Sequence, residues 1–362
     1  MSTAKRKIDW FIVTPIMAVI FLGLAMAVPN AGWPLILVAI GLLGSVLSAV
    51  HHAEVIAHRV GEPFGTLVLA LAVTVIEVAL IVSMMLAGGE STNSLPRDTV
   101  FAAVMIILNG IVGICLLVGG RRHFEQRFQL KGVSAALAVL ASIVILTLVL
   151  PNYTSSREGP FYNPSQLIFI AVSTLVLYAA FTLVQTVRHR DYFLPPPEHR
   201  ADEDLHAEPP TTRATLISFI ILLVALVVVV LSTKKISPVF ESWLMVAGAP
   251  KSVVGIAIAG LVLLPECIAA VRAAAANRLQ TSMNLAMGSA LASIGLTIPT
   301  VAIVALILDW PLALGLDEKS TVLLMLTLFV SVFSLGTGRT TLLHGVVHLV
   351  LFATYLFLSI VP

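Results

Sequence analysis

Two acidic residues lie in the middle of long apolar stretches. Glu77 is flanked by LALAVTVI and VALIVSMML, and Glu266 by GIAIAGLVLLP and CIAAV. A carboxylate at the centre of a bilayer costs about 2.5 kcal/mol or more, so such residues usually face a binding site or an ion pathway. Two carboxylates can neutralise one divalent cation, and without a cation their proximity and burial favour proton uptake. We therefore expect these glutamates to bind cations and protons in competition. The alternative for each is a protonated side chain hydrogen-bonded to a neighbouring helix.

Polar residues in neighbouring apolar stretches are secondary candidates for binding the cation. Thr74 lies three residues before Glu77, on the same face of a helix. Asn109 is the strongest of these candidates, because an amide without a partner is costly in lipid. Ser289 and Ser293 could bind the ion, or could equally serve as small residues for close helix packing.

Pro265 directly precedes the second glutamate. Within a helix, proline removes one backbone hydrogen bond and frees a carbonyl oxygen. A helix broken in the middle of the membrane offers such oxygens to a cation. A simple packing kink is the alternative.

Histidine and cysteine provide weaker indications of chemistry. His344 and His348 are one helical turn apart, which allows a metal pair, but packing or interfacial roles are favoured. Cys115 and Cys267 lack metal-ligand spacing and are interpreted as small buried residues. No cofactor is expected.

The elements that must position these residues are predicted to be membrane-spanning helices. Of the 362 residues, 58% are hydrophobic and 11% charged, and the mean hydropathy is +1.02. Soluble domains carry about 25% charged residues, so this composition excludes a soluble protein. The net charge of +2 gives no indication of nucleic-acid binding. Since a span needs about 20 apolar residues, we predict an all-α integral membrane protein with eleven spans, at residues 10–28, 33–50, 64–87, 99–119, 133–150, 165–187, 214–232, 250–275, 281–308, 320–335 and 340–361.

The distribution of basic residues predicts the orientation, because cytoplasmic loops carry an excess of Lys and Arg. With the N-terminus in the cytoplasm, the cytoplasmic side receives 15 of the 21 basic residues: Lys5, Arg6, Lys7, Arg59, Arg121, Arg122, Arg127, Lys131, Arg188, Arg190, Arg200, Arg213, Arg272, Arg278 and Arg339. We therefore predict a multi-pass protein of the bacterial inner membrane. Ala25-Met26-Ala27 resembles a signal-peptidase site, but the apolar run before it is long enough to be an uncleaved span.

The two halves of the chain are predicted to be inverted repeats. The predicted parts are an extra N-terminal helix (1–32), a first five-helix repeat (33–187), an acidic cytoplasmic linker (188–213) and a second five-helix repeat (214–362). Five is an odd number, so the second half enters the membrane in the opposite sense, as in many secondary transporters. Gly61-Glu62-Pro63 opens the span of Glu77, and Gly248-Ala249-Pro250 opens that of Glu266. Antiparallel packing of these spans would bring the two carboxylates together. The linker is either a solvated connector or a cation sensor.

Three segments of the sequence resemble the cation/calcium exchanger superfamily, and in particular its bacterial ChaA-type sodium/calcium:proton antiporters. They are HHAEVIAHRVGEPFGTLVLALAVTVIEVALIVSMMLAGG, RDTVFAAVMIILNGIVG and PECIAAVRAAAANRLQTSMNLAMGSALASIGLTIP. The resemblance implies an extra helix plus two inverted five-helix repeats, alternating access, and ion-binding acids at Glu77 and Glu266. It also matches Asn109 and Gly288-Ser289 to polar elements of the family.

The sequence departs from the family pattern near both acids. Plant and fungal relatives carry Gly-Asn where this chain has Val73-Thr74 and Val262-Leu263, and a common Gln corresponds to Ala292. Fewer ligand oxygens weaken the expectation of high-affinity calcium selectivity, so sodium and potassium are candidates instead of calcium or beside it.

These observations predict a cation/proton antiporter rather than an enzyme. It would export Ca²⁺ or Na⁺, with K⁺ as a further candidate, in exchange for H⁺. Its partners would be inorganic cations, protons and the lipid bilayer, with a homo-oligomer compatible with the sequence. A passive cation channel and a cation-dependent receptor or scaffold are the alternatives. The HExxH motif of metalloproteases is absent, and His51, His52 and His58 lie at a predicted span end.

Overall fold

The structure is a computed structural model that describes residues 10–28, 32–61, 64–88, 92–194, 210–247, 250 and 252–361. These residues form helices joined by short connections and one small sheet of two strands. The chain divides into two compact units. The first comprises Met1–Gly88 and Glu208–Trp243, and the second Gly89–Ala207 and Leu244–Pro362. Most of the predicted acidic linker (195–209), the N-terminal basic residues (5–7) and parts of the turns before the two glutamate-bearing spans (62–63, 248–249) lie outside the described residues.

The first unit contains α1 (Trp10–Ala27), α2 (Trp33–Val60), α3 (Phe64–Gly88) and most of α9 (Thr212–Ala247). α2 packs against both α1 and α3. Two polar contacts join α2 to α9: the His52 ring lies 3.0 Å from the Ser218 hydroxyl, and Arg59 donates to the Thr212 hydroxyl at 3.2 Å. Segments far apart in the sequence therefore meet in this unit.

The second unit contains the remaining helices and both strands. In chain order they are α4 (Leu95–Met105), η2 (Ile106–Ile111), α5 (Val112–His123), β1 (Glu125–Arg127), α6 (Leu130–Val144), η3 (Ile145–Val149), η4 (Leu150–Tyr153), α7 (Pro164–Leu183), η5 (Val184–Arg188), η6 (Arg190–Tyr192), α10 (Ser252–Val262), α11 (Leu264–Ala275), α12 (Leu279–Ile307), α13 (Glu318–Leu335), β2 (Arg339–Thr341) and α14 (Leu342–Ile360). η2, η3 and η5 are π-helical turns, and η4 and η6 are 3₁₀ turns.

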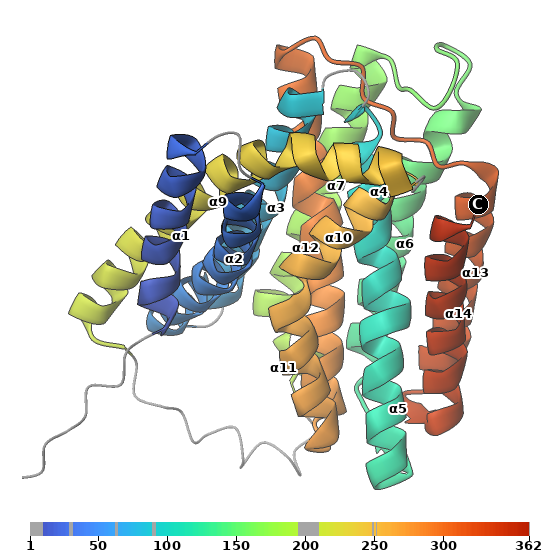
Figure 1. The fold of residues 1–362 in the computed structure, drawn as a ribbon. Coiled ribbons are helices and arrows are strands. Elements are labelled where there is room, and N and C mark those ends of the chain that lie inside the picture. The colour runs from blue at the N-terminus through green and yellow to red at the C-terminus, as the bar shows by residue number, and fades with distance from the viewer. Residues whose placement is uncertain are drawn as a thin grey trace, which may run out of the picture. The chain divides into compact units, whose positions relative to one another are not determined.

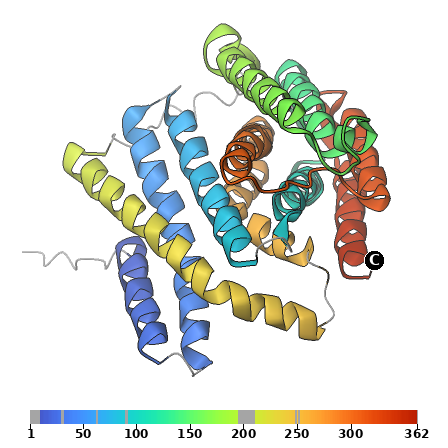
Figure 2. The ribbon, with the colours of Figure 1, turned by 90° about the horizontal axis from the view of Figure 1, so that it is seen from above.

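The centre of the second unit is formed by α4–η2–α5 and α12, most of whose residues are buried. α4 packs against α10, α5 against α11 and α14, and α12 against α6, α7 and α11 (Figures 1 and 2). Glycine allows the closest of these approaches. A Cβ atom at Gly345 in α14 would lie 2.5 Å from the backbone nitrogen of Leu117 in α5. The α5–α14 contact therefore depends on the absence of a side chain at this position.

A small antiparallel sheet joins two distant turns at one end of the second unit. β1 follows α5 and β2 precedes α14, and Gln126 pairs with Thr340 at the middle of the sheet. The buried Gln126 side chain also donates to the Ala274 carbonyl at 2.9 Å and to the Asn277 side chain at 3.0 Å. Gln126 therefore connects the turn after α5 with the turn before α14 through its backbone, and with the turn after α11 through its side chain.

The helices confirm the predicted membrane fold. Among the described residues, nine helices are long and apolar enough to cross a bilayer, and α10 with α11 makes a tenth span with a break. α3, apolar over Leu71–Leu86, takes the remaining predicted position. One face of α13 exposes Val322, Met325, Phe329 and Phe333. Large apolar residues at this spacing on an outer face are typical of a helix in contact with lipid.

Two spans extend beyond their predicted ends. The span predicted at 33–50 belongs to α2, which continues to Val60 and ends at Gly61, whose φ of 74° favours glycine. His51, His52 and His58 therefore lie within a helix. The span predicted at 214–232 belongs to α9, which continues to Ala247. Charged residues end an apolar run but do not end a helix, so hydropathy alone places these boundaries too early.

Candidate functional site

Glu266 lies at a break in a membrane-spanning segment of the second unit. α10 ends at Val262, α11 begins at Leu264, and the two helices are bent by 56° relative to one another. Pro265 occupies the first turn of α11, where a missing N–H is tolerated, and Glu266 follows in the same turn. The structure thus has a helix break at the place where Pro265 predicts a break or a kink.

The break exposes backbone groups beside Glu266 that can bind charged ligands. In a continuous helix the N–H of residue 265 would bond to the carbonyl of Leu261, and proline has no N–H to donate. The first N–H groups of α11 likewise have no acceptor within their own helix. Carbonyl oxygens suit a cation, while a helix N-terminus suits a carboxylate. This turn therefore combines a half-buried carboxylate with both kinds of backbone group.

Glu77 lies on the buried face of α3 in the first unit. Only 1% of Glu77 and 4% of Thr74 is exposed. Ile76, Leu80 and Ile81 are also buried, and together with Glu77 they follow the spacing of one helix face. The first predicted binding acid and its neighbouring hydroxyl are thus in the protein interior and do not face lipid. Glu77 and Glu266 belong to different units, so their binding of one shared ion stays a prediction.

Ser289 and Ser293 lie four residues apart on one face of α12. Ser293 is 4% exposed, and Ser289 is partly buried. α12 packs directly against α11, the helix that begins at the break before Glu266. Two of the secondary candidates are therefore on the neighbour of the glutamate helix.

Comparison with known proteins identifies the family to which this architecture belongs. The profile of the family described as "Sodium/calcium exchanger protein" matches residues 30–187 and 217–361. The chain belongs to the sodium/calcium exchanger family. The predicted resemblance to cation/calcium exchangers is thereby confirmed. Residues 188–216 lie between the two matched segments. The division into two inverted repeats joined by a linker stays a prediction.

Curated relatives align with this exchanger over nearly its whole length. It is 48% identical over 360 residues to "Putative ionic transporter y4hA" of Sinorhizobium fredii, covering 98% of this chain and 96% of that protein. It is 35% identical over 365 residues to "Sodium-potassium/proton antiporter ChaA" of Escherichia coli, covering 98% of this chain and 99% of that protein.

Solved structures share the fold of this exchanger. Native YfkE superposes with a TM-score of 0.74 at 17% identity, covering 97% of this chain and 100% of that chain. The H⁺/Ca²⁺ exchanger CAX gives a TM-score of 0.71 at 15% identity, covering 96% of this chain and 87% of that chain. At these identities the likeness shows the fold alone, which is that of a polytopic membrane exchanger.

Asn109 takes part in a polar network between helices of the second unit. It lies in the π-helical turn η2 and is completely buried. Its Nδ2 donates to the Thr327 hydroxyl on α13 at 2.9 Å, and its Oδ1 lies 3.2 Å from Nδ1 of His348 on α14. The other ring nitrogen of His348 lies 2.7 Å from the Ser334 hydroxyl. Both ends of the amide thus bind protein groups. Direct binding of a cation by Asn109 stays a prediction.

The two histidines of the last span have different roles in the structure. His348 is buried in the network of Asn109, whereas the half-buried His344 accepts a hydrogen bond from the backbone N–H of Thr341 at 3.1 Å, at the start of α14. In the part of the chain that the structure describes, no three His, Cys, Asp or Glu side chains are grouped to hold a metal ion. His348 thus contributes to packing and His344 to the start of a helix, while a metal pair stays an untested alternative. Cys115 is buried and Cys267 half-buried, and neither forms a disulfide.

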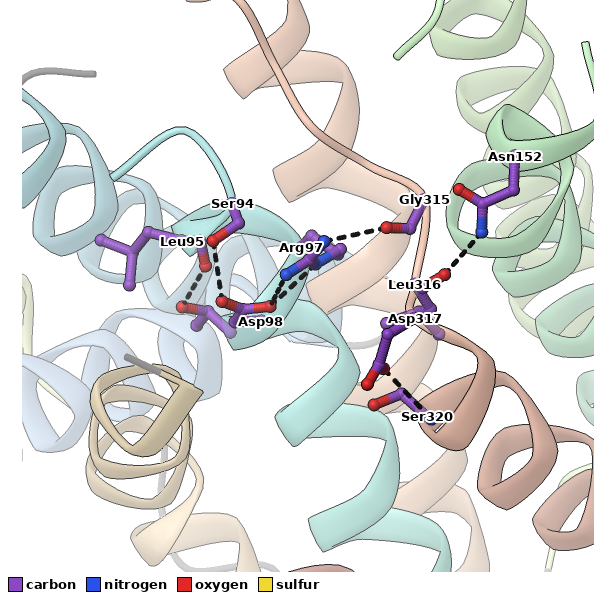
Figure 3. Close-up of polar contacts among 10 residues, drawn as sticks. Ser94, Leu95, Arg97, Asp98, Asn152, Gly315, Leu316, Asp317 and Ser320 are labelled. Atoms are coloured by element: carbon purple, nitrogen blue, oxygen red, sulfur yellow. Dashed lines mark hydrogen bonds and ion pairs between the residues drawn. The ribbon is translucent and has the colours of Figure 1, made fainter. Parts of the chain in front are cut away.

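Sequence analysis missed a buried ion pair at the start of α4 (Figure 3). Arg97 donates to Asp98 at 2.8 and 2.7 Å through two nitrogens, and a third nitrogen donates to the Gly315 carbonyl at 2.9 Å. The Ser94 hydroxyl donates to the other oxygen of Asp98 at 3.0 Å. The predicted span began at residue 99, so this pair was assigned to a solvated connector. Pro96, typical of a first helical turn, was the available signal for an earlier start.

Proposed function

We propose that this chain is a secondary active antiporter that exchanges Ca²⁺, Na⁺ or K⁺ for protons across the bacterial inner membrane. Membership of the sodium/calcium exchanger family supports cation exchange. The 35% identity to a sodium-potassium/proton antiporter over nearly the full length supports protons as the counter-ion and includes K⁺ among the cations. Ca²⁺ stays a candidate because two carboxylates match its charge and its preference for oxygen ligands.

The observation that carries this proposal is the position of Glu266 in the first turn of α11, directly after a 56° break in an apolar span. Glu77, buried on α3, is the second acid. In the proposed mechanism these carboxylates bind one cation together, with hydroxyls of Thr74, Ser289 and Ser293 as further ligands. When the cation leaves, protons bind to the same oxygens. Cation and proton therefore cross the membrane in alternate halves of the transport cycle, which couples the two gradients.

The proposed orientation places the basic end of the second unit in the cytoplasm. The C-terminal ends of α5 and α11 and both strands lie at one end of this unit (Figure 1). This end carries Arg121, Arg122, Arg127, Arg272, Arg278 and Arg339. An excess of arginine marks the cytoplasmic side of bacterial membrane proteins. The N-terminal ends of α4, α10 and α13 would then face the periplasm.

Everted membrane vesicles provide the test. Respiration acidifies the vesicle lumen, and a fluorescent dye reports the pH gradient. Addition of CaCl₂, NaCl or KCl to vesicles with the wild-type protein is expected to release luminal protons. Lower external pH should raise the cation concentration needed for half-maximal release, because protons compete for the same oxygens. Absence of release for all three cations would exclude proton-coupled exchange, and uptake driven by voltage without proton release would indicate a channel.

Charge-neutral variants test the role of the two acids. Glu77→Gln and Glu266→Gln keep the side-chain size but cannot bind and release a proton, so both are expected to lose exchange entirely. Glu125→Gln is the matched control, because Glu125 lies in the β1 strand and makes only 3.6 Å ion pairs with Arg127 and Arg339. All three variants should be present in the membrane at the wild-type level. Wild-type exchange by either acid variant would remove that acid from the mechanism.

A further inference from the structure

A polar cavity of about 330 Å³ lies in the second unit, at the end opposite the two strands and the C-terminal ends of α5 and α11. It is enclosed by the start of α4, the start of α10, the start of α13 and the end of α14. Six water molecules at ~30 Å³ each occupy ~180 Å³, so the cavity has room for a cation with its first hydration shell.

The cavity is lined by two acidic and two basic residues with unequal freedom to act on an ion. Arg97 and Asp98 neutralise each other through their short ion pair. Lys319 donates to the carbonyl of Leu358, near the end of α14, at 2.9 Å. Asp317 uses Oδ1 to accept the backbone N–H of Ser320 at 3.1 Å, which caps α13 (Figure 3). Asp317 is exposed and lines the cavity, and among the described residues no basic side chain pairs with it, so its negative charge can attract a cation in the cavity.

The same helix that lines the cavity leads to the proposed binding acid. Ser252, the first residue of α10, borders the cavity, and Glu266 follows the break at the other end of α10. The fourteen-residue separation corresponds to ~21 Å along helices at 1.5 Å per residue. α10 is also closely packed on α4, because a Cβ atom at Gly255 would lie 2.7 Å from the Asp98 carbonyl carbon. The cavity thus lies at the start of α10, the helix that leads to the break before Glu266.

We propose that this cavity is the periplasmic vestibule of the cation pathway, and that Asp317 attracts hydrated cations into it while Lys319 limits that attraction. This proposal rests on the proposed function. Two carboxylates that lie beside two basic groups bind a cation only weakly as direct ligands, because the positive charges oppose it. The vestibule therefore acts through its electrostatic potential on hydrated ions and releases them readily.

The charges predict the size of the effect. For an ion ~6 Å from the Asp317 carboxylate at the dielectric constant of water, removal of one charge weakens binding ~3-fold for a monovalent ion and ~10-fold for a divalent ion. Asp317→Asn makes this change while keeping a side-chain oxygen that caps α13. Lys319→Gln removes the opposite charge and should shift affinity in the opposite direction.

The experiment compares the two membrane faces. Cation concentrations for half-maximal exchange are measured in right-side-out vesicles, where the periplasmic face meets the added cation, and in everted vesicles. In right-side-out vesicles Asp317→Asn is expected to raise the value ~3-fold for Na⁺ and ~10-fold for Ca²⁺, and Lys319→Gln to lower it. In everted vesicles the cation concentration for half-maximal exchange should be the same for both variants as for the wild-type protein. At an ionic strength of ~1 M the Debye length falls to ~3 Å, and the differences should disappear.

Glu318→Gln is the matched control, because Glu318 is the exposed neighbour of Asp317 and does not line the cavity. If Asp317→Asn and Glu318→Gln need the same cation concentrations for half-maximal exchange while the wild-type protein exchanges cations, the vestibule is refuted and the proposed function stands. A purely structural role of Asp317 predicts a lower maximal rate, equal for both cations and independent of salt. If the wild-type protein exchanges no cation, the proposed function fails, and the vestibule proposal fails with it.

Discussion

The network around His348 predicts a large loss of stability from a single substitution. His348→Leu keeps an apolar side chain in the α14 interface but removes two hydrogen bonds, to Asn109 at 3.2 Å and to Ser334 at 2.7 Å. Ser334 retains a weak alternative in the Ser331 carbonyl at 3.4 Å. The Asn109 carbonyl oxygen is the group that loses most, because it is completely buried.

The size of the loss follows from these contacts. A buried acceptor left without its partner costs about 1–3 kcal/mol. Hydrogen bonds between membrane helices average ~0.6 kcal/mol and reach ~1.7 kcal/mol each, so the loss of two amounts to ~1.2–3.4 kcal/mol. We therefore expect His348→Leu to lower the free energy of unfolding by ~2 kcal/mol. The assay is unfolding of the purified protein by SDS in dodecyl maltoside micelles, followed by far-UV circular dichroism.

His344→Leu is the control for this prediction, one helical turn away. Its ring accepts one hydrogen bond from the Thr341 backbone at a half-buried position, where water can replace it. We expect a loss of about 0.5 kcal/mol. If His348→Leu is no less stable than His344→Leu, the network does not stabilise the fold as described, and the reasoning is refuted.

Two further substitutions test local packing and helix capping in the same unfolding assay. Gly345→Ala should cost about 1–3 kcal/mol, because the added Cβ would lie 2.5 Å from the Leu117 nitrogen, whereas Gly23→Ala meets no atom within 4 Å and should cost far less. Equal losses would contradict the close α5–α14 contact. Asn163→Ala should cost about 1 kcal/mol, because it removes the capping box in which Asn163 accepts from the Gln166 N–H at 2.8 Å. Asn163→Asp preserves the acceptor and should be near wild type; a loss as large as that of Asn163→Ala would exclude capping as the cause.

Sequence reasoning was most successful where local sequence determines local structure. Long apolar runs predicted the spans, and the single residue Pro265 predicted the place of the helix break because it lacks a backbone N–H. Its errors concerned boundaries. α2 and α9 continue past the ends of their apolar runs because histidine, lysine and glutamate are compatible with a helix outside the hydrocarbon.

Contacts between distant residues could not be predicted from the sequence. Asn109 and His348 are 239 positions apart, and each was singled out for a different reason. Their pairing depends on how α14 packs on α5 and η2, which the spacing within either helix does not determine. The same limit applies to Asp317, which looks like an ordinary helix cap in the sequence. Its proposed role depends on the cavity that four separate helix ends border.

The length of α9 has a mechanical consequence for this exchanger. Its 36 residues measure ~54 Å along the helix at 1.5 Å per residue, with Pro238 inside it, while the hydrocarbon core of a bilayer is ~30 Å thick. The apolar part, Thr212–Ile236, has 25 residues and is ~38 Å long, so a tilt is enough to fit it to that thickness, and the helix continues beyond it to Ala247. Because a proline inside a helix removes a backbone hydrogen bond and favours a kink, Pro238 allows the part of α9 after the apolar stretch to change direction at the edge of the bilayer.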